Sequence, residues 1–215
     1  MNQSKLHYLN AMGIQSWQLK HKEQPEDEKL KNLACLRGMV SNCTACGLDK
    51  TRTQTVFGVG NPHADLMIIG EAPGFNEDQQ GEPFVGRAGL LLNAMLESIG
   101  FERSAVYIAN ILKCRPPNNR DPLAEEVKHC TPFLEKQIAI IKPKLLLATG
   151  RIAAHYLLNN KASLQQLRGK IYQYNDTPLI ITYHPAYLLR NPLDKGKAFQ
   201  DLQLTFRTLE TLQVS

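Results

Sequence analysis

A glycine-rich segment at residues 70–89, GEAPGFNEDQQGEPFVGRAG, constrains the fold of this chain more than any other feature. The apolar run at 66–69 precedes it directly and is typical of a buried strand, and leucine, methionine and isoleucine recur at helical spacing over 90–99. The sequence therefore predicts a strand, a glycine-rich loop and a helix. Ligands of open α/β sheets bind at this place, beside the carboxyl ends of the strands. Because glycine loses much backbone freedom on ordering, we infer that the backbone approaches a ligand closely here.

The pattern of a strand followed by a helix recurs along the rest of the chain. Four apolar runs predict core strands, and four segments with helical periodicity alternate with them. The runs lie at 66–69, 106–111, 145–148 and 179–182, and the helical segments at 90–99, 123–141, 151–158 and 194–212. Asp121 and Pro122 are typical of an N-cap and the first residue of the second helix. This alternation predicts a mostly parallel sheet with helices on both faces.

The N-terminal part of the chain has a different pattern. Two amphipathic helices are expected there, at residues 5–20 and 28–40, and together they form an N-terminal helical extension over 1–40 packed on the main domain. We expect Cys35, within the second helix, to be an ordinary buried thiol. The main domain then spans 41–215.

Composition excludes several classes of protein. No apolar run approaches the roughly 18–20 residues of a membrane span, so no membrane partner is expected. The first residues lead into no apolar signal region, and we expect the protein to stay in the compartment where it is made. Five cysteines then indicate a reducing compartment rather than a disulfide framework. The formal net charge of +5 permits a polyanionic partner, although ordinary solubility explains it equally well.

Four of the cysteines have a spacing typical of metal ligands. Cys43 and Cys46 form a C-x-x-C pair in a polar segment, and Cys114 and Cys130 follow further along the chain. Four thiolates hold either a structural zinc ion or an iron–sulfur cluster. Unligated core thiols are the third interpretation, and the residue types alone leave all three open.

Unusual polar and aromatic residues follow three of the predicted strands. Phe84 lies in the glycine-rich loop, Asn110 near the end of the second strand, and His184 after the fourth. An asparagine amide offers a donor and an acceptor, a phenylalanine ring offers a stacking face, and histidine stabilises developing negative charge. Each has an ordinary structural explanation when taken alone, as do Glu77 and Asp78 as charges at a helix N-terminus. Their convergence predicts a pocket for a planar, amide-like ring.

In combination and order, these motifs resemble the family 4 uracil-DNA glycosylases, the iron–sulfur branch of the uracil-DNA glycosylase superfamily. The matching segments are 56–58, 70–74, 81–89, 110–117 and 184–190, and the resemblance covers about 33–202. It implies a three-layer α/β/α sandwich around a central four-stranded parallel sheet, with the glycosylase domain and its cluster loop in 41–215. It also implies a hydrolase of base excision repair that flips uracil out of damaged DNA and excises it, leaving an abasic site.

The resemblance assigns the uracil contacts to four residues. Phe84 would stack on the flipped base, which is inaccessible inside the duplex. Asn110 would pair with the O4 and N3–H edge and reject cytosine, whose amino group reverses that pattern. The backbone at Glu71 and Ala72 would contact uracil O2.

It assigns the chemical step to a further group. His184 would stabilise the negative charge that grows on O2 as the glycosidic bond breaks. Leu188 would fill the gap left by the flipped base. The best-studied branch of the superfamily has an aspartate where this chain has Ala72, which cannot polarise water. Glu77 is the candidate for water activation or for stabilising the sugar cation, and Glu71 is the alternative.

The resemblance further implies that Cys43, Cys46, Cys114 and Cys130 hold a [4Fe–4S] cluster with a structural role. The expected partner is uracil-containing DNA, single- or double-stranded, in the bacterial cytoplasm or nucleoid, and a monomer suffices for the chemistry. Two alternatives remain. One is an iron–sulfur protein that binds DNA, or associates with a polymerase, without robust uracil excision, and the other is a relative that excises another deaminated base.

Overall fold

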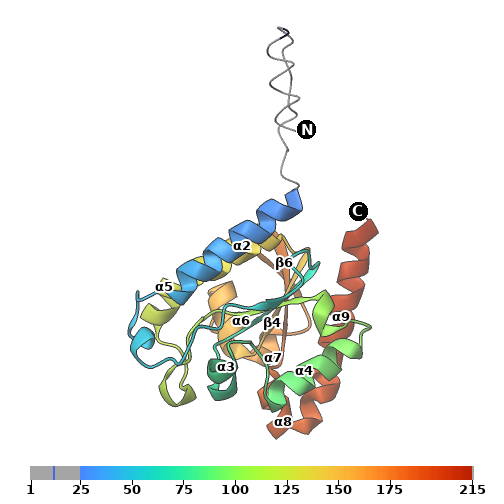
Figure 1. Ribbon diagram of the computed structural model, residues 1–215. Helices are drawn as coiled ribbons and strands as arrows, with labels where there is room; N and C mark the ends of the chain where they lie inside the picture. Colours follow the sequence, from blue (N-terminus) through green and yellow to red (C-terminus); the bar gives the residue numbers. More distant parts are fainter. Residues whose placement is uncertain (1–11, 13–24, 215) are drawn as a thin grey trace.

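The computed structural model describes Met12 and residues 25–214, and it has three layers, with helices on both faces of a central sheet (Figure 1). Apart from Met12, the helix expected at 5–20 lies outside the described residues. Among the described helices, none combines the length and the apolar character that crossing a bilayer requires.

The sheet has six strands in the order β1-β3-β2-β4-β6-β5. The strands are β1 Val59–Gly60, β2 Leu66–Gly70, β3 Tyr107–Asn110, β4 Leu145–Thr149, β5 Ile171–Tyr174 and β6 Thr177–Thr182. The four central strands β3, β2, β4 and β6 pair in parallel and match the four predicted apolar runs, which confirms the predicted fold class. The antiparallel edge strands β1 and β5 were not predicted. β1 has only 2 residues, and β5 alternates exposed with half-buried positions, so neither has an apolar run.

Eight α-helices are described. They are α2 Pro25–Ser41, α3 Phe75–Gln80, α4 Arg87–Glu97, α5 Ala124–Ile141, α6 Arg151–Leu158, α7 Leu164–Leu167, α8 Pro185–Arg190 and α9 Lys195–Val214. Short 3-10 turns lie at Gly47–Lys50, Arg103–Ala105, Pro117–Asn119 and Pro192–Asp194. The predicted helices at 90–99, 123–141, 151–158 and 194–212 correspond to α4, α5, α6 and α9.

Alternate residues of the buried strands supply the two halves of the core. In β2, Met67 and Ile69 pack under α2, α5, α6 and α7, whereas Leu66 and Ile68 pack under α4, α8 and α9. This period of two follows from the pleat of a strand that is covered on both faces. The described part of the N-terminal extension, α2, thus shares the core through its contact with α5 (Figure 1). The division of the chain at residue 40 stays a prediction.

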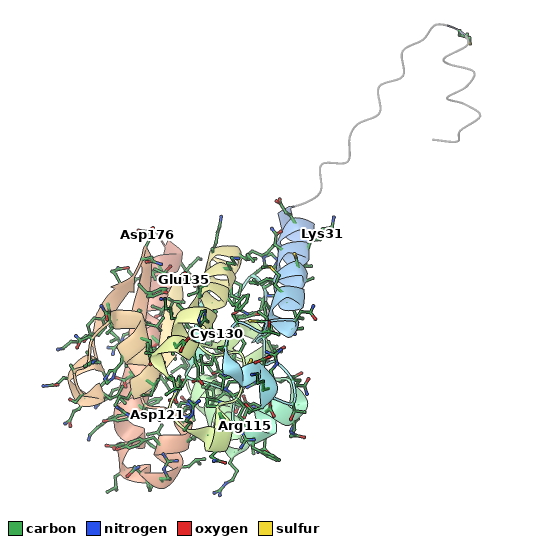
Figure 2. All side chains as sticks on the ribbon, turned by 90° about the vertical axis from the view of Figure 1, so that its left-hand side faces the viewer. Lys31, Arg115, Asp121, Cys130, Glu135 and Asp176 are labelled. Atoms are coloured by element: carbon green, nitrogen blue, oxygen red, sulfur yellow. The ribbon has the colours of Figure 1, made fainter. Side chains whose placement is uncertain are left out.

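The carboxyl ends of the parallel strands meet at one end of the molecule. The short helices α3 and α8, which follow β2 and β6, lie there at the bottom of Figure 1. Arg115 and Asp121 lie at this same end, far from Lys31 and Asp176 (Figure 2). Loops from three separate strands therefore come together at a single edge.

Three local expectations were wrong. The segment 71–84, expected to be a loop throughout, contains the helix α3. Helix α5 has Leu123 as its N-cap rather than Asp121, and the Glu126 carboxylate three residues later accepts the Leu123 N–H at 2.8 Å. Cys35 is exposed rather than buried, on the outer side of α2.

Candidate active site

A cavity of about 440 Å³ opens at the carboxyl edge of the sheet. Segments that follow β2, β3 and β6 line it, as the positions of the polar residues in the sequence predicted. Six residues expected to contact the base or carry the reaction lie in its wall: Glu71, Ala72, Glu77, Phe84, Asn110 and His184. The seventh, Leu188, does not line it.

Gly70 lets two side chains of this wall approach the backbone closely. It lies opposite Asn110 in the parallel pairing of β2 with β3. A Cβ atom at Gly70 would lie 2.2 Å from Asn110 Oδ1 and 2.8 Å from the Phe84 ring. Only glycine therefore allows the amide and the aromatic ring to share this part of the cavity.

Asn110 carries an unused hydrogen-bonding group into the cavity. Its side chain is only 2% exposed, and Oδ1 accepts no hydrogen bond from any described residue. An unpaired buried polar atom costs about 1–3 kcal/mol. Such an atom in a cavity wall indicates a site built to receive a hydrogen-bond donor from a ligand.

Glu77 fixes the loop that presents Phe84. One carboxylate oxygen accepts the Gly74 N–H at 3.1 Å, and the other accepts the N–H groups of Val85 at 3.0 Å and Gly86 at 3.4 Å. Phe84, directly before these amides, has the left-handed backbone angle φ 54°, which costs a bulky residue conformational energy. Three amides bound to one carboxylate offset this strain, so Glu77 acts as a loop clamp.

Glu71 has the electrostatic environment of a group that exchanges protons near neutral pH. Burial and the Asp121 carboxylate raise its pKa to about 7, and the Arg151 guanidinium opposes them. Asp121 and Arg151 form an ion pair at 3.3 Å beside it. The Glu71 carboxylate makes no hydrogen bond with any other described residue, which leaves its oxygens available in the cavity.

His184 is held as a neutral hydrogen-bond donor. As the N-cap of α8, it accepts the Ala186 N–H at Nδ1 over 3.1 Å, so the proton of the neutral ring is on Nε2. Burial and the Arg190 guanidinium lower the pKa of the ring to about 4, and Glu77 opposes them. The ring stacks on Phe84 with centroids 5.5 Å apart.

Leu188 is not placed for the role of a wedge. It is 1% exposed and packs in the core beneath α8, so it cannot enter DNA without disrupting this helix. The next residue, Leu189, is 37% exposed, and Arg190 after it lines the cavity. The two leucines are equivalent in the sequence, and only the packing of α8 distinguishes them.

A buried polar network lies behind Asn110, and the sequence pattern did not predict it. Lys113 is 1% exposed, and its Nζ donates to the Asn110 carbonyl at 2.7 Å and to Gln137 Oε1 at 2.6 Å. Gln137 Nε2 in turn donates to the Phe57 carbonyl at 2.9 Å. Burial lowers the pKa of Lys113 to about 8, opposed by Cys130 and Cys114. The spacing of Gln137 in its helix gave no signal for this contact.

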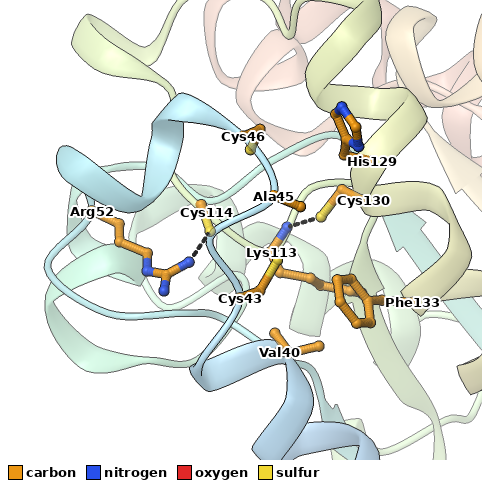
Figure 3. Close-up of a pocket in the computed structure, with 10 residues that line it drawn as sticks. All are labelled: Val40, Cys43, Ala45, Cys46, Arg52, Lys113, Cys114, His129, Cys130 and Phe133. Atoms are coloured by element: carbon orange, nitrogen blue, oxygen red, sulfur yellow. Dashed lines mark hydrogen bonds between the residues drawn. The ribbon is translucent and has the colours of Figure 1, made fainter.

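The four spaced cysteines line one cavity on the other side of Lys113 (Figure 3). Two N–H groups donate to their sulfurs, from Arg52 Nη1 to Cys114 Sγ at 3.0 Å and from the Lys113 backbone to Cys130 Sγ at 3.2 Å. Burial raises the pKa of Cys130 to about 11 and also raises that of Cys114, where Arg52 opposes it. All five cysteines are free of disulfides.

This donor set fits a metal group that deprotonates its ligands. Buried thiols with raised pKa values stay protonated at neutral pH unless a metal takes the place of the proton. Among the described residues, no three His, Cys, Asp or Glu side chains converge as the ligands of a single metal ion. The four thiols line one shared space.

Comparison with known proteins gives consistent matches. The family model described as "Uracil DNA glycosylase superfamily" matches residues 57–204. A type-4 uracil-DNA glycosylase of Archaeoglobus fulgidus is 45% identical over 161 residues, which cover 71% of this chain and 81% of the relative. The corresponding protein of Pyrobaculum aerophilum is 43% identical, with 81% and 93% covered, and that of Thermotoga maritima is 46% identical, with 71% and 80% covered.

Proposed function

The chain belongs to the uracil DNA glycosylase superfamily, and we propose that it flips uracil out of DNA and hydrolyses its N-glycosidic bond, leaving an abasic site. It is thus a uracil-DNA glycosylase of DNA repair, with DNA as its substrate. The observation that carries the proposal is the buried Asn110 amide with an unpaired Oδ1, next to the Phe84 ring in the cavity wall.

Base selection follows from the two polar atoms of one amide. Asn110 Oδ1 accepts the uracil N3–H, and Nδ2 donates to O4. Cytosine presents an acceptor at N3 and an amino donor at C4, so both contacts with Asn110 become repulsive. Phe84 supplies a stacking face for the flipped ring. A protein that only binds DNA needs no such base-selective pair, which disfavours the binding alternative.

The departing base carries the negative charge of the reaction. As the bond between the sugar C1′ and uracil N1 breaks, the electron pair moves onto the ring and collects on O2. The neutral His184 donates its Nε2–H to this oxygen, and the backbone at Glu71 and Ala72 faces it as well. Loss of one such donor typically costs about 2.7–4 kcal/mol of transition-state stabilisation.

We assign the attacking water to Glu71 rather than to Glu77. Both oxygens of Glu77 already accept backbone N–H groups, so this carboxylate is engaged in holding the loop. Glu71 has free oxygens, and its pKa is about 7. It takes the proton as the water oxygen bonds to C1′, and its charge stabilises the cationic sugar. Glu77 contributes by holding Phe84 in place.

Leu189 replaces Leu188 as the side chain that fills the gap in the DNA. It is the exposed leucine of α8 and directly precedes Arg190, which lines the cavity. An apolar wedge at this place stabilises the flipped state by occupying the vacated stack.

Cys43, Cys46, Cys114 and Cys130 would hold a [4Fe–4S] cluster, and its metal–thiolate bonds would join separate segments of the chain. Cys43 and Cys46 come from the segment after α2, Cys114 from the loop after β3, and Cys130 from α5. This linkage fixes the loop that begins with Asn110. We assign no step of the hydrolysis to the cluster.

Single-turnover excision tests the proposal directly. The purified protein is mixed with oligonucleotides that contain uracil, thymine or hypoxanthine, and alkali then cuts the abasic sites. We expect cutting of the uracil strand, and absence of cutting by a protein loaded with iron and sulfide would refute the function. Cutting of only the hypoxanthine strand would support the alternative of another deaminated base. Asn110→Asp should weaken uracil excision, and His184→Ala should lower the rate by roughly 10²-fold or more.

A further inference from the structure

Phe75 is an exposed aromatic residue that does not belong to either half of the core. It is the first residue of α3, directly after Gly74 in the cavity wall, and it is 55% exposed. The Arg115 guanidinium lies over its ring, with Cζ 5.1 Å from the centroid. One face of the ring is thus covered by a cation, and much of the rest is open to solvent.

Arg115 is itself held in position. Its Nε donates to Asn119 Oδ1 at 2.7 Å, and Asn119 has the left-handed backbone angle φ 53°. Its two Nη groups make no hydrogen bond with the described residues. Pro116 and Asn119 line the cavity, as Gly74 does on the opposite strand loop. Phe75 and Arg115 thus directly adjoin residues of the cavity wall, at the end of the molecule where Figure 2 places Arg115.

We propose that Phe75 and Arg115 form a stacking platform for the nucleobase next to the flipped uracil, an inference that rests on the proposed function. Flipping removes a base from the stack, and its neighbour in the same strand loses a stacking partner on one face. Phe75 offers a replacement surface at the mouth through which the flipped nucleotide must pass. Arg115 orients the ring and directs its free Nη groups toward the phosphate backbone.

The platform matters most for single-stranded DNA. In a duplex, the opposite strand still holds the neighbouring base in place by pairing. In a single strand, only stacking orders that base, so the loss of Phe75 has no compensation. Leu189 lies on α8, next in sequence to Arg190 of the cavity wall, and it is assigned to the gap in the DNA rather than to the neighbouring base.

The test removes the ring from the protein and the base from the DNA, separately and together. Single-turnover excision is measured on a single-stranded uracil oligonucleotide, and on two versions with a baseless nucleotide directly 5′ or 3′ of the uracil. For Phe75→Ala on the intact strand, we expect the half-saturating concentration to rise roughly 5- to 100-fold, the range for one stacked base, with an unchanged maximal rate. One of the two baseless strands should raise the half-saturating concentration of the wild-type protein by a similar factor. For Phe75→Ala, the same strand should not raise the half-saturating concentration any further, because both changes remove the same interaction.

Matched variants separate stacking from general surface effects. Phe75→Trp should keep tight binding, and Phe75→Leu, which keeps an apolar side chain without a π face, should behave like Phe75→Ala. Phe199→Ala removes another exposed ring, 41% exposed on α9, and should change nothing. An unchanged half-saturating concentration for Phe75→Ala would overturn the platform. Equal sensitivity of wild type and Phe75→Ala to both baseless strands would overturn it as well.

Binding of the same oligonucleotides, measured by fluorescence anisotropy, keeps this result separate from the proposed function. If the wild-type protein releases no uracil, the function fails, and the platform is then judged from the dissociation constants alone. If uracil is released normally and the dissociation constants of wild type and Phe75→Ala agree, the function stands and the platform fails.

Discussion

The ionisation of Glu71 should set the acid limit of uracil excision. Burial raises its pKa to about 7, so the carboxylate that accepts the proton of water is half formed near neutral pH. Below that pH, the single-turnover rate should fall about tenfold per pH unit, because only the ionised fraction is active. His184, whose pKa is lowered to about 4, stays neutral through this range, so it should add no further pH dependence to the single-turnover rate.

Two neighbouring charged residues change the pKa of Glu71 in opposite directions, and this allows its assignment as the proton acceptor to be tested. Asp121 raises the pKa of Glu71, so Asp121→Asn should move the acid limb to lower pH. Arg151 lowers the pKa of Glu71, so Arg151→Gln should move the limb to higher pH. Their side chains are 68% and 57% exposed, and exposed charge pairs contribute about 0.2–1 kcal/mol. At 1.36 kcal/mol per unit, each midpoint should move by up to about 0.7 pH unit.

The assay is the single-turnover rate at saturating enzyme, measured between about pH 5 and pH 9 for wild type and the two variants. Bound DNA adds negative charge in every case, so the differences between proteins carry the result. Glu71→Gln is the control and should give a slow rate without the acid limb. Midpoints that move in the same direction, or a limb that persists in Glu71→Gln, would show that another group titrates.

Three further changes test the wall of the site. Gly70→Ala should abolish most uracil excision, since its Cβ would lie 2.2 Å from Asn110 Oδ1; single-turnover rates that match wild type would contradict this. Lys113→Met leaves buried acceptors unpaired and should lower the free energy of unfolding by about 1–3 kcal/mol, measured by chemical denaturation at known iron content. Leu188→Ala should cost about 2–5 kcal/mol of stability in the same assay, whereas Leu189→Ala should slow excision from duplex DNA and leave stability unchanged.

The core of the fold could be predicted because buried parallel strands leave a simple signal in the sequence. Each of the four central strands contains an apolar run that is buried on both faces. The edge strand β5 alternates with solvent instead, and its turn to β6 depends on Asn175 with φ 50°, a local feature without an apolar pattern. Edge strands of this kind become recognisable only once the neighbouring strand is in place.

In the candidate site, too, some features could be predicted from the sequence and others could not. Asn110 and His184 could be predicted because parallel strands bring their carboxyl ends to one edge, whatever the details of the loops. The role of Glu77 could not, since its three amide partners depend on the path of the chain from Gly74 to Gly86. The difference between Leu188 and Leu189 depends on which side of α8 faces the core, and a helix of 6 residues has too little periodicity to reveal it.

One buried side chain connects the cysteine cavity to the recognition of the base. Cys130 and Gln137 both lie on α5, and the residue that contacts both of them is Lys113, through its backbone N–H and its Nζ. The same Nζ holds the carbonyl of Asn110, whose side chain lies in the wall of the active site. A displacement of α5 relative to the loop after β3 must therefore either break a buried hydrogen bond or move Asn110. A metal group held by Cys130 and Cys114 would oppose this displacement, and in this way it would affect the precision with which Asn110 is positioned toward uracil.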